Sequence, residues 1–144
     1  MSKTVAKGIN AVYLPVTSPL RSSEWYVNYL GLSLLMPVNA DSTQAQLGFS
    51  NGQTIFLIRT KHQQNANYLE VGGTEQCPIT IEVEEFDHVF RTLQSKGLKL
   101  DPIEDNGDCG KNFYLYDPDG NKIDMWSGWP SDTSAPSSII GTGV

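Results

Sequence analysis

The feature of this sequence that most constrains its fold is an internal repeat. Each half begins with a segment of alternating hydrophobicity, continues with an amphipathic helical stripe, and ends in further strand-like segments. Three pairs of equivalent positions are separated by nearly the same number of residues. Val16 and Val83 are 67 residues apart, Gly31 and Gly97 are 66 apart, and Gly52 and Gly120 are 68 apart. Because the alternation recurs together with the glycines, the sequence predicts two copies of one βαβββ unit.

In the first copy, the residues at both ends of the predicted helix are typical of helix starts and stops. Residues 9–16 alternate and predict a strand, and Ser18-Pro19 then supplies a helix cap with proline at the first helical position. A stripe from Trp25 to Leu30 predicts one buried face, and Gly31 ends the helix. Three further strands are expected at residues 32–38, 44–49 and 53–60.

The second copy repeats this order. Residues 78–83 alternate, and a helical stripe from Phe86 to Leu93 is ended by Gly97. Strands are expected at residues 98–100, 112–116 and 122–127, the last two joined by the turn Asp117-Pro118-Asp119-Gly120-Asn121.

These patterns predict one domain over residues 1–130 in a chain of 144 residues. Within it, module one covers about 8–60, a polar linker covers 61–76, and module two covers about 77–128. The segment 131–144 is rich in Ser, Pro, Gly and Thr and is expected to be a loose tail.

Composition narrows the range of partners and compartments. The formal net charge is −6 and the pI is about 4.7, which disfavours nucleic acid and anionic membrane surfaces as partners. No apolar run reaches the length of a membrane span, and the first residues do not form a signal peptide. Cys77 and Cys109 are not in a paired motif, so free thiols and a cytoplasmic location are expected.

The chain resembles the vicinal oxygen chelate superfamily of glyoxalases, bleomycin-resistance proteins and extradiol dioxygenases. The resemblance spans about residues 8–128 and rests on residues 9–16, on Trp25-Tyr26 before Leu30-Gly31, and on residues 113–124. It implies an α+β fold in which two βαβββ modules form curled mixed sheets around a shared cleft, with the helices outside. It also implies a homodimer, the common state of family members.

In metal-dependent members of that superfamily, four side chains of the cleft bind a divalent ion. The resemblance places these positions at Ala11, Phe56, Pro78 and Asp124. Three of the four have no donor atom, and a single carboxylate does not make a zinc site. No cofactor is therefore predicted.

Strand parity predicts which residues line the cleft instead. The face shared with Asp124 carries aromatic rings, two carboxylates and two hydroxyls, which is typical of a small-molecule pocket and favours an aromatic or amine-bearing ligand. The predicted ligand-binding residues are Tyr13, Thr54, Phe56, Thr80, Glu82, Asp124 and Trp126.

Three hypotheses about function follow. The first is a metal-independent small-molecule-binding protein of the glyoxalase/bleomycin-resistance type, with no catalytic residues. The second is a metal-dependent glyoxalase-like lyase, isomerase or dioxygenase, whose ion is bound by non-standard ligands around Asp124. The third is an interaction protein in which the cleft is closed.

Overall fold

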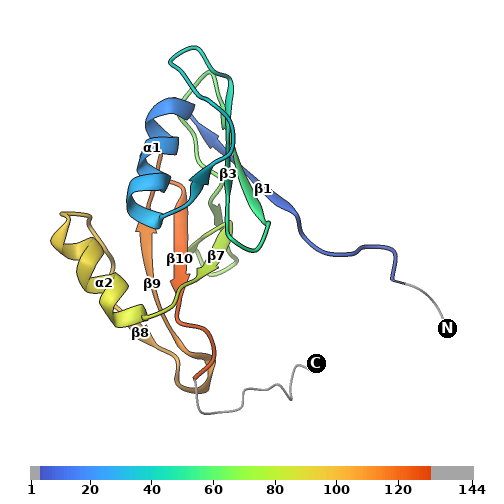
Figure 1. Ribbon diagram of the computed structural model, residues 1–144. Helices are drawn as coiled ribbons and strands as arrows, with labels where there is room; N and C mark the ends of the chain where they lie inside the picture. The colour runs from blue at the N-terminus through green and yellow to red at the C-terminus, as the bar shows by residue number, and fades with distance from the viewer. Residues whose placement is uncertain (1–3, 131–144) are drawn as a thin grey trace. The chain divides into compact units, whose positions relative to one another are not determined.

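The structure, a computed structural model, describes residues 4–130 (Figure 1). The predicted loose tail, 131–144, lies outside the described residues. Within the described part, the chain forms two compact units, the first of residues 4–66 and 117–121, and the second of residues 67–116 and 122–130. The turn between the last two strands of the chain thus belongs to the first unit.

The first unit is a four-stranded mixed sheet with one helix on it. In chain order its elements are β1 (Ala11–Val16), α1 (Pro19–Leu30), β2 (Ser33–Leu34), β3 (Gln44–Gly48) and β4 (Thr54–Arg59). The strand order is β1-β4-β3-β2, with β1 parallel to β4 and the other pairs antiparallel. This is the βαβββ arrangement that the first copy of the repeat predicts.

Helix α1 begins and ends where its local signals place it. The Ser18 hydroxyl accepts a hydrogen bond of 3.1 Å from the Arg21 amide, and Gly31 ends the helix in the left-handed conformation at φ 71°. The helix packs on β3, β4 and β2 (Figure 1). The buried apolar residues of this unit are Leu14, Val16, Tyr26, Leu32, Ala45, Leu47, Ile55 and Leu57.

The second unit repeats the arrangement and adds a hairpin. Its elements are β5 (Tyr68–Leu69), β6 (Glu75–Gln76), β7 (Ile79–Glu82), α2 (Phe86–Ser95), β8 (Glu104–Asp105), a 3₁₀ turn (Gly107–Cys109), β9 (Lys111–Tyr116) and β10 (Lys122–Trp126). Its main sheet has the order β7-β10-β9-β8, with β7 parallel to β10 and the other pairs antiparallel. The order matches that of the first sheet strand for strand, which confirms the predicted α+β fold of two repeated modules.

Aromatic contacts attach α2 to its sheet. The ring centroid of Phe113 on β9 lies 5.4 Å from that of Phe86 and 4.9 Å from that of Phe90. Phe113, Leu115, Ile123 and Met125 are all buried, so the apolar face of β9 and β10 is the core of this unit.

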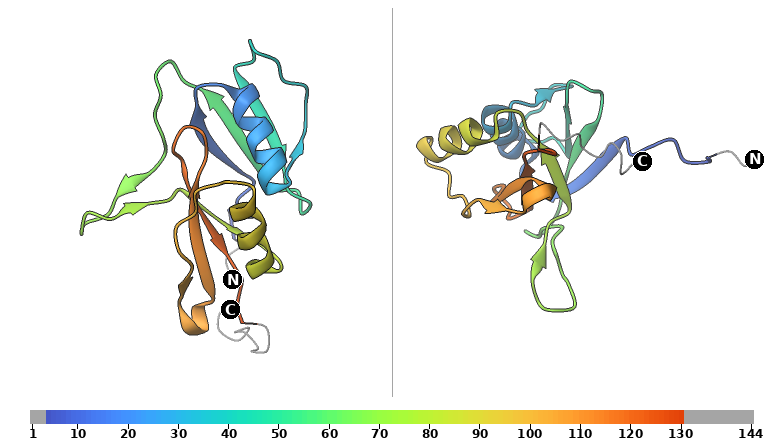
Figure 2. Two further views of the ribbon diagram at one scale, coloured as in Figure 1. Left: turned by 90° about the vertical axis from the view of Figure 1, so that its left-hand side faces the viewer. Right: turned by 90° about the horizontal axis from the view of Figure 1, so that it is seen from below.

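Two expectations about secondary structure need correction. The stretch 61–76, expected as a polar linker, contains the β5–β6 hairpin, which projects from the rest of the second unit (Figure 2). The strand expected at residues 98–100 instead lies at Glu104–Asp105. The Leu98 amide still donates to the Leu93 carbonyl at 3.3 Å, so this stretch completes the end of α2.

No helix within residues 4–130 has the length and hydropathy to cross a membrane.

Candidate functional site

Three predicted ligand-binding residues lie together in the first unit. Tyr13 on β1 is paired with Phe56 on β4, and their ring centroids lie 5.0 Å apart. Thr54 lies on the same face of β4, where its hydroxyl donates to the Asn10 carbonyl at 3.0 Å. Tyr13 is 61% exposed whereas Ile55 and Leu57 are buried, so the structure places the aromatic rings on the open face of this sheet, as strand parity predicts.

The other four predicted residues lie together in the second unit. Thr80 is paired with Asp124, and Glu82 is paired with Trp126, across the parallel strands β7 and β10. On the other side of β10, Tyr114 is opposite Asp124 and Asn112 is opposite Trp126. We call this surface the Asp124 face, and it comprises Thr80, Glu82, Asn112, Tyr114, Asp124 and Trp126.

Both oxygens of the Asp124 carboxylate accept hydrogen bonds from neighbouring strands. The Thr80 hydroxyl donates to Oδ2 at 2.9 Å, and the Asn112 side-chain amide donates to Oδ1 at 2.8 Å. Asn106 in turn donates to Oδ1 of Asn112 at 2.7 Å, which fixes the direction in which the Asn112 amide points. Each carboxylate oxygen can accept more than one hydrogen bond, so Asp124 is oriented and still able to bind a donor.

The 3₁₀ turn also positions the aromatic ring beside Asp124. The indole Nε1 of Trp126 donates to the Cys109 carbonyl at 2.8 Å. The loop that begins at Asn106 and ends at Gly110 therefore holds both Asp124, through Asn112, and Trp126. Asp124 and Trp126 are alternate residues of β10, so their side chains lie on the same face, and a single loop positions both the carboxylate and the indole ring.

Tyr114 is held on the Asp124 face by a cation–π contact. The Lys122 ammonium lies 4.3 Å from the Tyr114 ring centroid and donates to the Glu75 carbonyl at 2.6 Å. Burial raises the pKa of Tyr114, and the nearby Asp124 and Glu104 carboxylates add to the shift. The phenol therefore remains a neutral hydrogen-bonding group at physiological pH.

The sequence prediction missed Asn112, Tyr114 and Asn106. The predicted site residues all lie on the first and last strands of each module, whereas Asn112 and Tyr114 lie on β9, the strand before the last. Antiparallel pairing of two strands joined by a tight turn puts Tyr114 opposite Asp124, and this parity was a usable signal. The Asn106–Asn112 hydrogen bond had no such signal, because it depends on the path of the 3₁₀ turn.

A second carboxylate cluster lies in the first unit and has a structural role. Asp117 accepts hydrogen bonds from the Tyr26 phenol at 2.7 Å and from the Asn121 side chain at 2.9 Å. Asp119 accepts from the Thr17 hydroxyl at 2.8 Å. Both carboxylates are buried, and burial raises the pKa of Asp117 against the lowering effect of its hydrogen bonds. These contacts anchor the Asp117–Asn121 turn to α1 and to Thr17, the residue that follows β1.

The four positions that bind metal in metal-dependent relatives do not form a donor set here. Ala11, Phe56 and Pro78 have no side-chain donor atom, and Asp124 is engaged by Thr80 and Asn112. Within residues 4–130, no three His, Cys, Asp or Glu side chains lie close enough together to hold an ion. The four side chains offer one carboxylate among them, which is fewer ligands than a divalent ion takes.

An open depression of about 390 Å³ lies elsewhere on the first unit. It follows the β2–β3 connection, and none of the predicted ligand-binding residues lines it. Its lining residues are Met36, Pro37, Asn39, Asp41, Ser42, Thr43 and Gln44.

Comparison with known families gives one match that covers most of the chain. The model of the Glyoxalase/Bleomycin resistance protein/Dioxygenase superfamily matches residues 8–125. No curated protein sequence matches the chain significantly.

Solved structures with the same fold differ in their described roles. TnmS3, an antibiotic binding protein from Streptomyces sp. CB03234, is 18% identical with a TM-score of 0.68, over 88% of this chain and 99% of its own. Lactoylglutathione lyase from Agrobacterium tumefaciens is 13% identical with a TM-score of 0.67, over 87% and 96%. Oxidase ChaP-H2 is 18% identical with a TM-score of 0.62, over 85% and 94%. At these identities the likeness shows the fold alone.

Proposed function

This chain belongs to the Glyoxalase/Bleomycin resistance protein/Dioxygenase superfamily, and on that premise we propose that it binds an amine-bearing aromatic small molecule without a metal ion. The Asp124 face is the part of the molecule that carries this proposal. An antibiotic binding protein is among the solved structures that share the fold, which is compatible with a binding role.

The single observation that favours an amine is the environment of Asp124. Its two oxygens are oriented by Thr80 and Asn112, and the rings of Tyr114 and Trp126 belong to the same face. A carboxylate held between aromatic side chains provides both a charge-assisted hydrogen bond and favourable contact for a protonated aromatic amine. A neutral ligand of the same shape gains only the aromatic contact.

The proposal that no metal takes part rests on the side chains at the four positions that correspond to the metal ligands of metal-dependent family members. A polarising ion needs several N, O or S ligands, and three of the four positions here have hydrocarbon side chains. Elemental analysis of protein purified without chelators tests this point. Less than about a tenth of an ion per chain after incubation with Zn²⁺, Mn²⁺ or Ni²⁺ is expected, whereas one ion per chain, lost in Asp124→Ala, supports the metal-dependent lyase, isomerase or dioxygenase instead.

The binding test uses two probes of nearly the same shape. 1-Naphthylmethylamine carries an ammonium group where 1-naphthalenemethanol carries a hydroxyl, and both are followed by naphthalene fluorescence. The amine is expected to bind about tenfold more tightly than the alcohol, because only the amine forms a charge-assisted hydrogen bond with Asp124.

Two variants locate the binding. Asp124→Asn is expected to remove the preference for the amine, whereas Glu84→Gln, which removes the same charge from an exposed position of the same unit, is expected to retain it. Equal binding of the two probes by the unaltered protein, or an unchanged preference in Asp124→Asn, contradicts the proposal.

A further inference from the structure

Two tryptophans form a right-angled corner at the end of β10. The ring centroids of Trp126 and Trp129 lie 5.1 Å apart with an interplanar angle of 90°. Trp129 is 49% exposed, and it was not among the residues that sequence reasoning selected. A large exposed indole held against a second indole leaves aromatic surface accessible from solvent.

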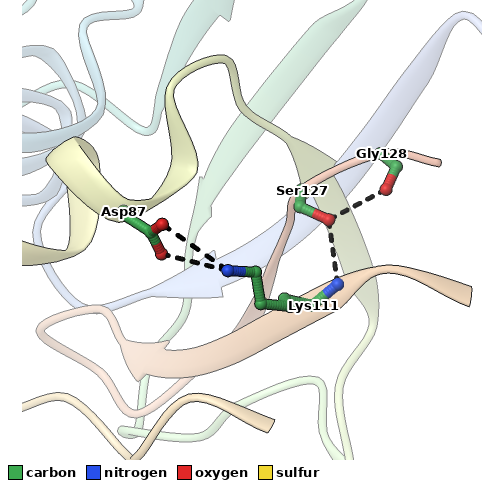
Figure 3. A network of polar contacts seen from close by, with 4 residues as sticks. All are labelled: Asp87, Lys111, Ser127 and Gly128. Carbon is green, nitrogen blue, oxygen red and sulfur yellow. Dashed lines mark hydrogen bonds and ion pairs between the residues drawn. The ribbon is translucent and has the colours of Figure 1, made fainter. Parts of the chain in front are cut away.

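The backbone between the two tryptophans is held in place. The Ser127 hydroxyl accepts from the Lys111 amide and donates to the Gly128 carbonyl, both at 2.8 Å (Figure 3). Trp126 is fixed by its hydrogen bond to the Cys109 carbonyl. The corner is therefore organised before any ligand arrives, which lowers the entropic cost of binding.

A carboxylate lies directly against this backbone. A Cβ atom added at Gly128 would lie 2.5 Å from Oε2 of Glu82, so the Glu82 side chain reaches the residue between the two tryptophans. Glu82 is exposed, and within residues 4–130 no hydrogen bond or ion pair to its carboxylate is found. The Lys111 ammonium is paired with Asp87 at 3.4 Å (Figure 3). Glu82 thus has no charged partner among the described residues, and its carboxylate lies next to the backbone that joins the two tryptophans.

We propose that Glu82, Trp126 and Trp129 form a subsite for a methylated ammonium group, quaternary or tertiary. Indole faces attract such cations through their ring quadrupole, and a quaternary nitrogen has no N–H with which to use the acceptors of Asp124. Glu82 supplies the compensating charge. This subsite deepens the proposed small-molecule binding and rests on it, since Glu82 and Trp126 belong to the Asp124 face.

The subsite has its own probe pair. Choline carries a trimethylammonium group, and 3,3-dimethyl-1-butanol has the same shape with carbon in place of nitrogen. Saturation-transfer NMR on the methyl signal of each compound, titrated against the full-length chain, measures the two affinities. Choline is expected to bind about tenfold more tightly than the alcohol.

Variants assign the binding to the corner. Glu82→Gln and Trp129→Leu are each expected to weaken choline binding by about fivefold or more, whereas Trp129→Phe retains most of it because a ring face remains. Glu24→Gln, the same change at an exposed position of α1, is expected to bind choline as the unaltered protein does. Circular dichroism of each variant checks that the fold persists.

The outcomes separate this subsite from the proposed function. Choline bound no better than its neutral analogue, or with unchanged affinity in Glu82→Gln and Trp129→Leu, overturns the subsite whatever the naphthyl probes do. The opposite outcome is also informative. If choline binds at the corner but binding of the naphthyl probes does not depend on Asp124, the subsite is supported and the proposed role of Asp124 is refuted.

Discussion

The phenol of Tyr26 donates a hydrogen bond of 2.7 Å to Oδ2 of Asp117, a residue 91 positions later in the chain. Both side chains are buried, and burial raises the pKa of each. The Tyr26 hydrogen bond acts on Asp117 in the opposite direction and stabilises its ionised form. The two residues therefore couple the stability of the first unit to pH.

We expect Tyr26→Phe to destabilise the protein by about 1–3 kcal/mol near neutral pH, because a buried carboxylate loses one of its donors. Without this bond the pKa of Asp117 in the folded state rises further. A carboxyl group whose pKa is higher in the folded than in the unfolded state stabilises the fold in acid, and this stabilisation is lost as the pH rises through the folded-state pKa. The free-energy cost of Tyr26→Phe therefore grows from acid to neutral pH.

Urea unfolding at about pH 4 and about pH 7 measures this cost. Tyr29→Phe is the matched control, since Tyr29 lies on the same helix and its contact in the described structure is a ring contact with Trp25. A cost of Tyr26→Phe that does not exceed that of Tyr29→Phe, or that is the same at both pH values, contradicts the coupling.

Gly110→Ala tests the close packing around Trp126. Gly110 is buried with φ 83° and ψ −171°, and an added Cβ would collide with the Gly128 carbonyl and the Trp126 indole nitrogen. We expect a loss of about 2–4 kcal/mol from this backbone strain and overpacking, together with a changed tryptophan emission spectrum.

Gly107→Ala provides the comparison within the same loop. Gly107 also has a positive φ, of 63°, but an added Cβ would meet nothing within 4 Å. Its expected cost is the strain alone, about 1 kcal/mol, with the emission spectrum unchanged. Denaturant unfolding followed by fluorescence reports both quantities, and equal costs for the two variants would refute the steric argument.

The support of Asp124 by Asn112 is measurable in a double-mutant cycle. Asn112 is 6% exposed and makes two side-chain hydrogen bonds, whereas Thr80 makes its bond from an exposed position. We expect Asn112→Ala to cost about 2 kcal/mol and Thr80→Val less than about 1 kcal/mol. Combining Asn112→Ala with Asp124→Ala is expected to show a coupling of about 1–2 kcal/mol, and strictly additive costs would argue against the support.

The two cysteines are expected to react with Ellman's reagent at different rates. Cys109 is exposed, whereas burial and the neighbouring Asp124 carboxylate raise the pKa of the Cys77 thiol. Less thiolate is then present at Cys77 at a given pH, so its reaction is slower and accelerates as pH rises toward the raised pKa. Cys109→Ser and Cys77→Ser isolate the two rates.

Asp124→Asn adds a further readout to this experiment. Loss of the carboxylate charge lowers the pKa of Cys77 toward its ordinary value and speeds its labelling, while the rate at Cys109 stays the same. A faster reaction at Cys77 than at Cys109 in the unaltered protein would be inconsistent with the structure.

The elements that sequence reasoning predicted correctly are those with local signals. Helix α1 has its cap at Ser18, its proline at the first position and its glycine at the end, and all three act within a few residues. The faces of β1, β4, β7 and β10 follow from alternation alone. The β5–β6 hairpin was missed because its strands are two residues long, too short to show an alternation.

The polar networks are harder to predict because their partners are distant in sequence. The turn at residues 117–121 was expected from its proline and glycine, but its contacts with Thr17, Ser22 and Tyr26 join residues about a hundred positions apart. Likewise, Asp124 was selected as a site residue, whereas the hydrogen bond from Asn106 that orients Asn112 depends on the path of the 3₁₀ turn. Trp129 lies beyond the last strand, where no periodicity marks it.

Because residues 117–121 belong to the first unit, a cut between the two copies of the repeat would separate contacts that lie within that unit. A gene fragment ending near residue 66 would encode the helix that carries Tyr26 and Ser22 but not the acidic turn that accepts their hydrogen bonds. The complementary fragment would expose that turn with its two aspartates unshielded. The first copy of the repeat thus depends on a turn that the second copy supplies, so the two copies cannot be divided at residue 66 without exposing buried polar groups.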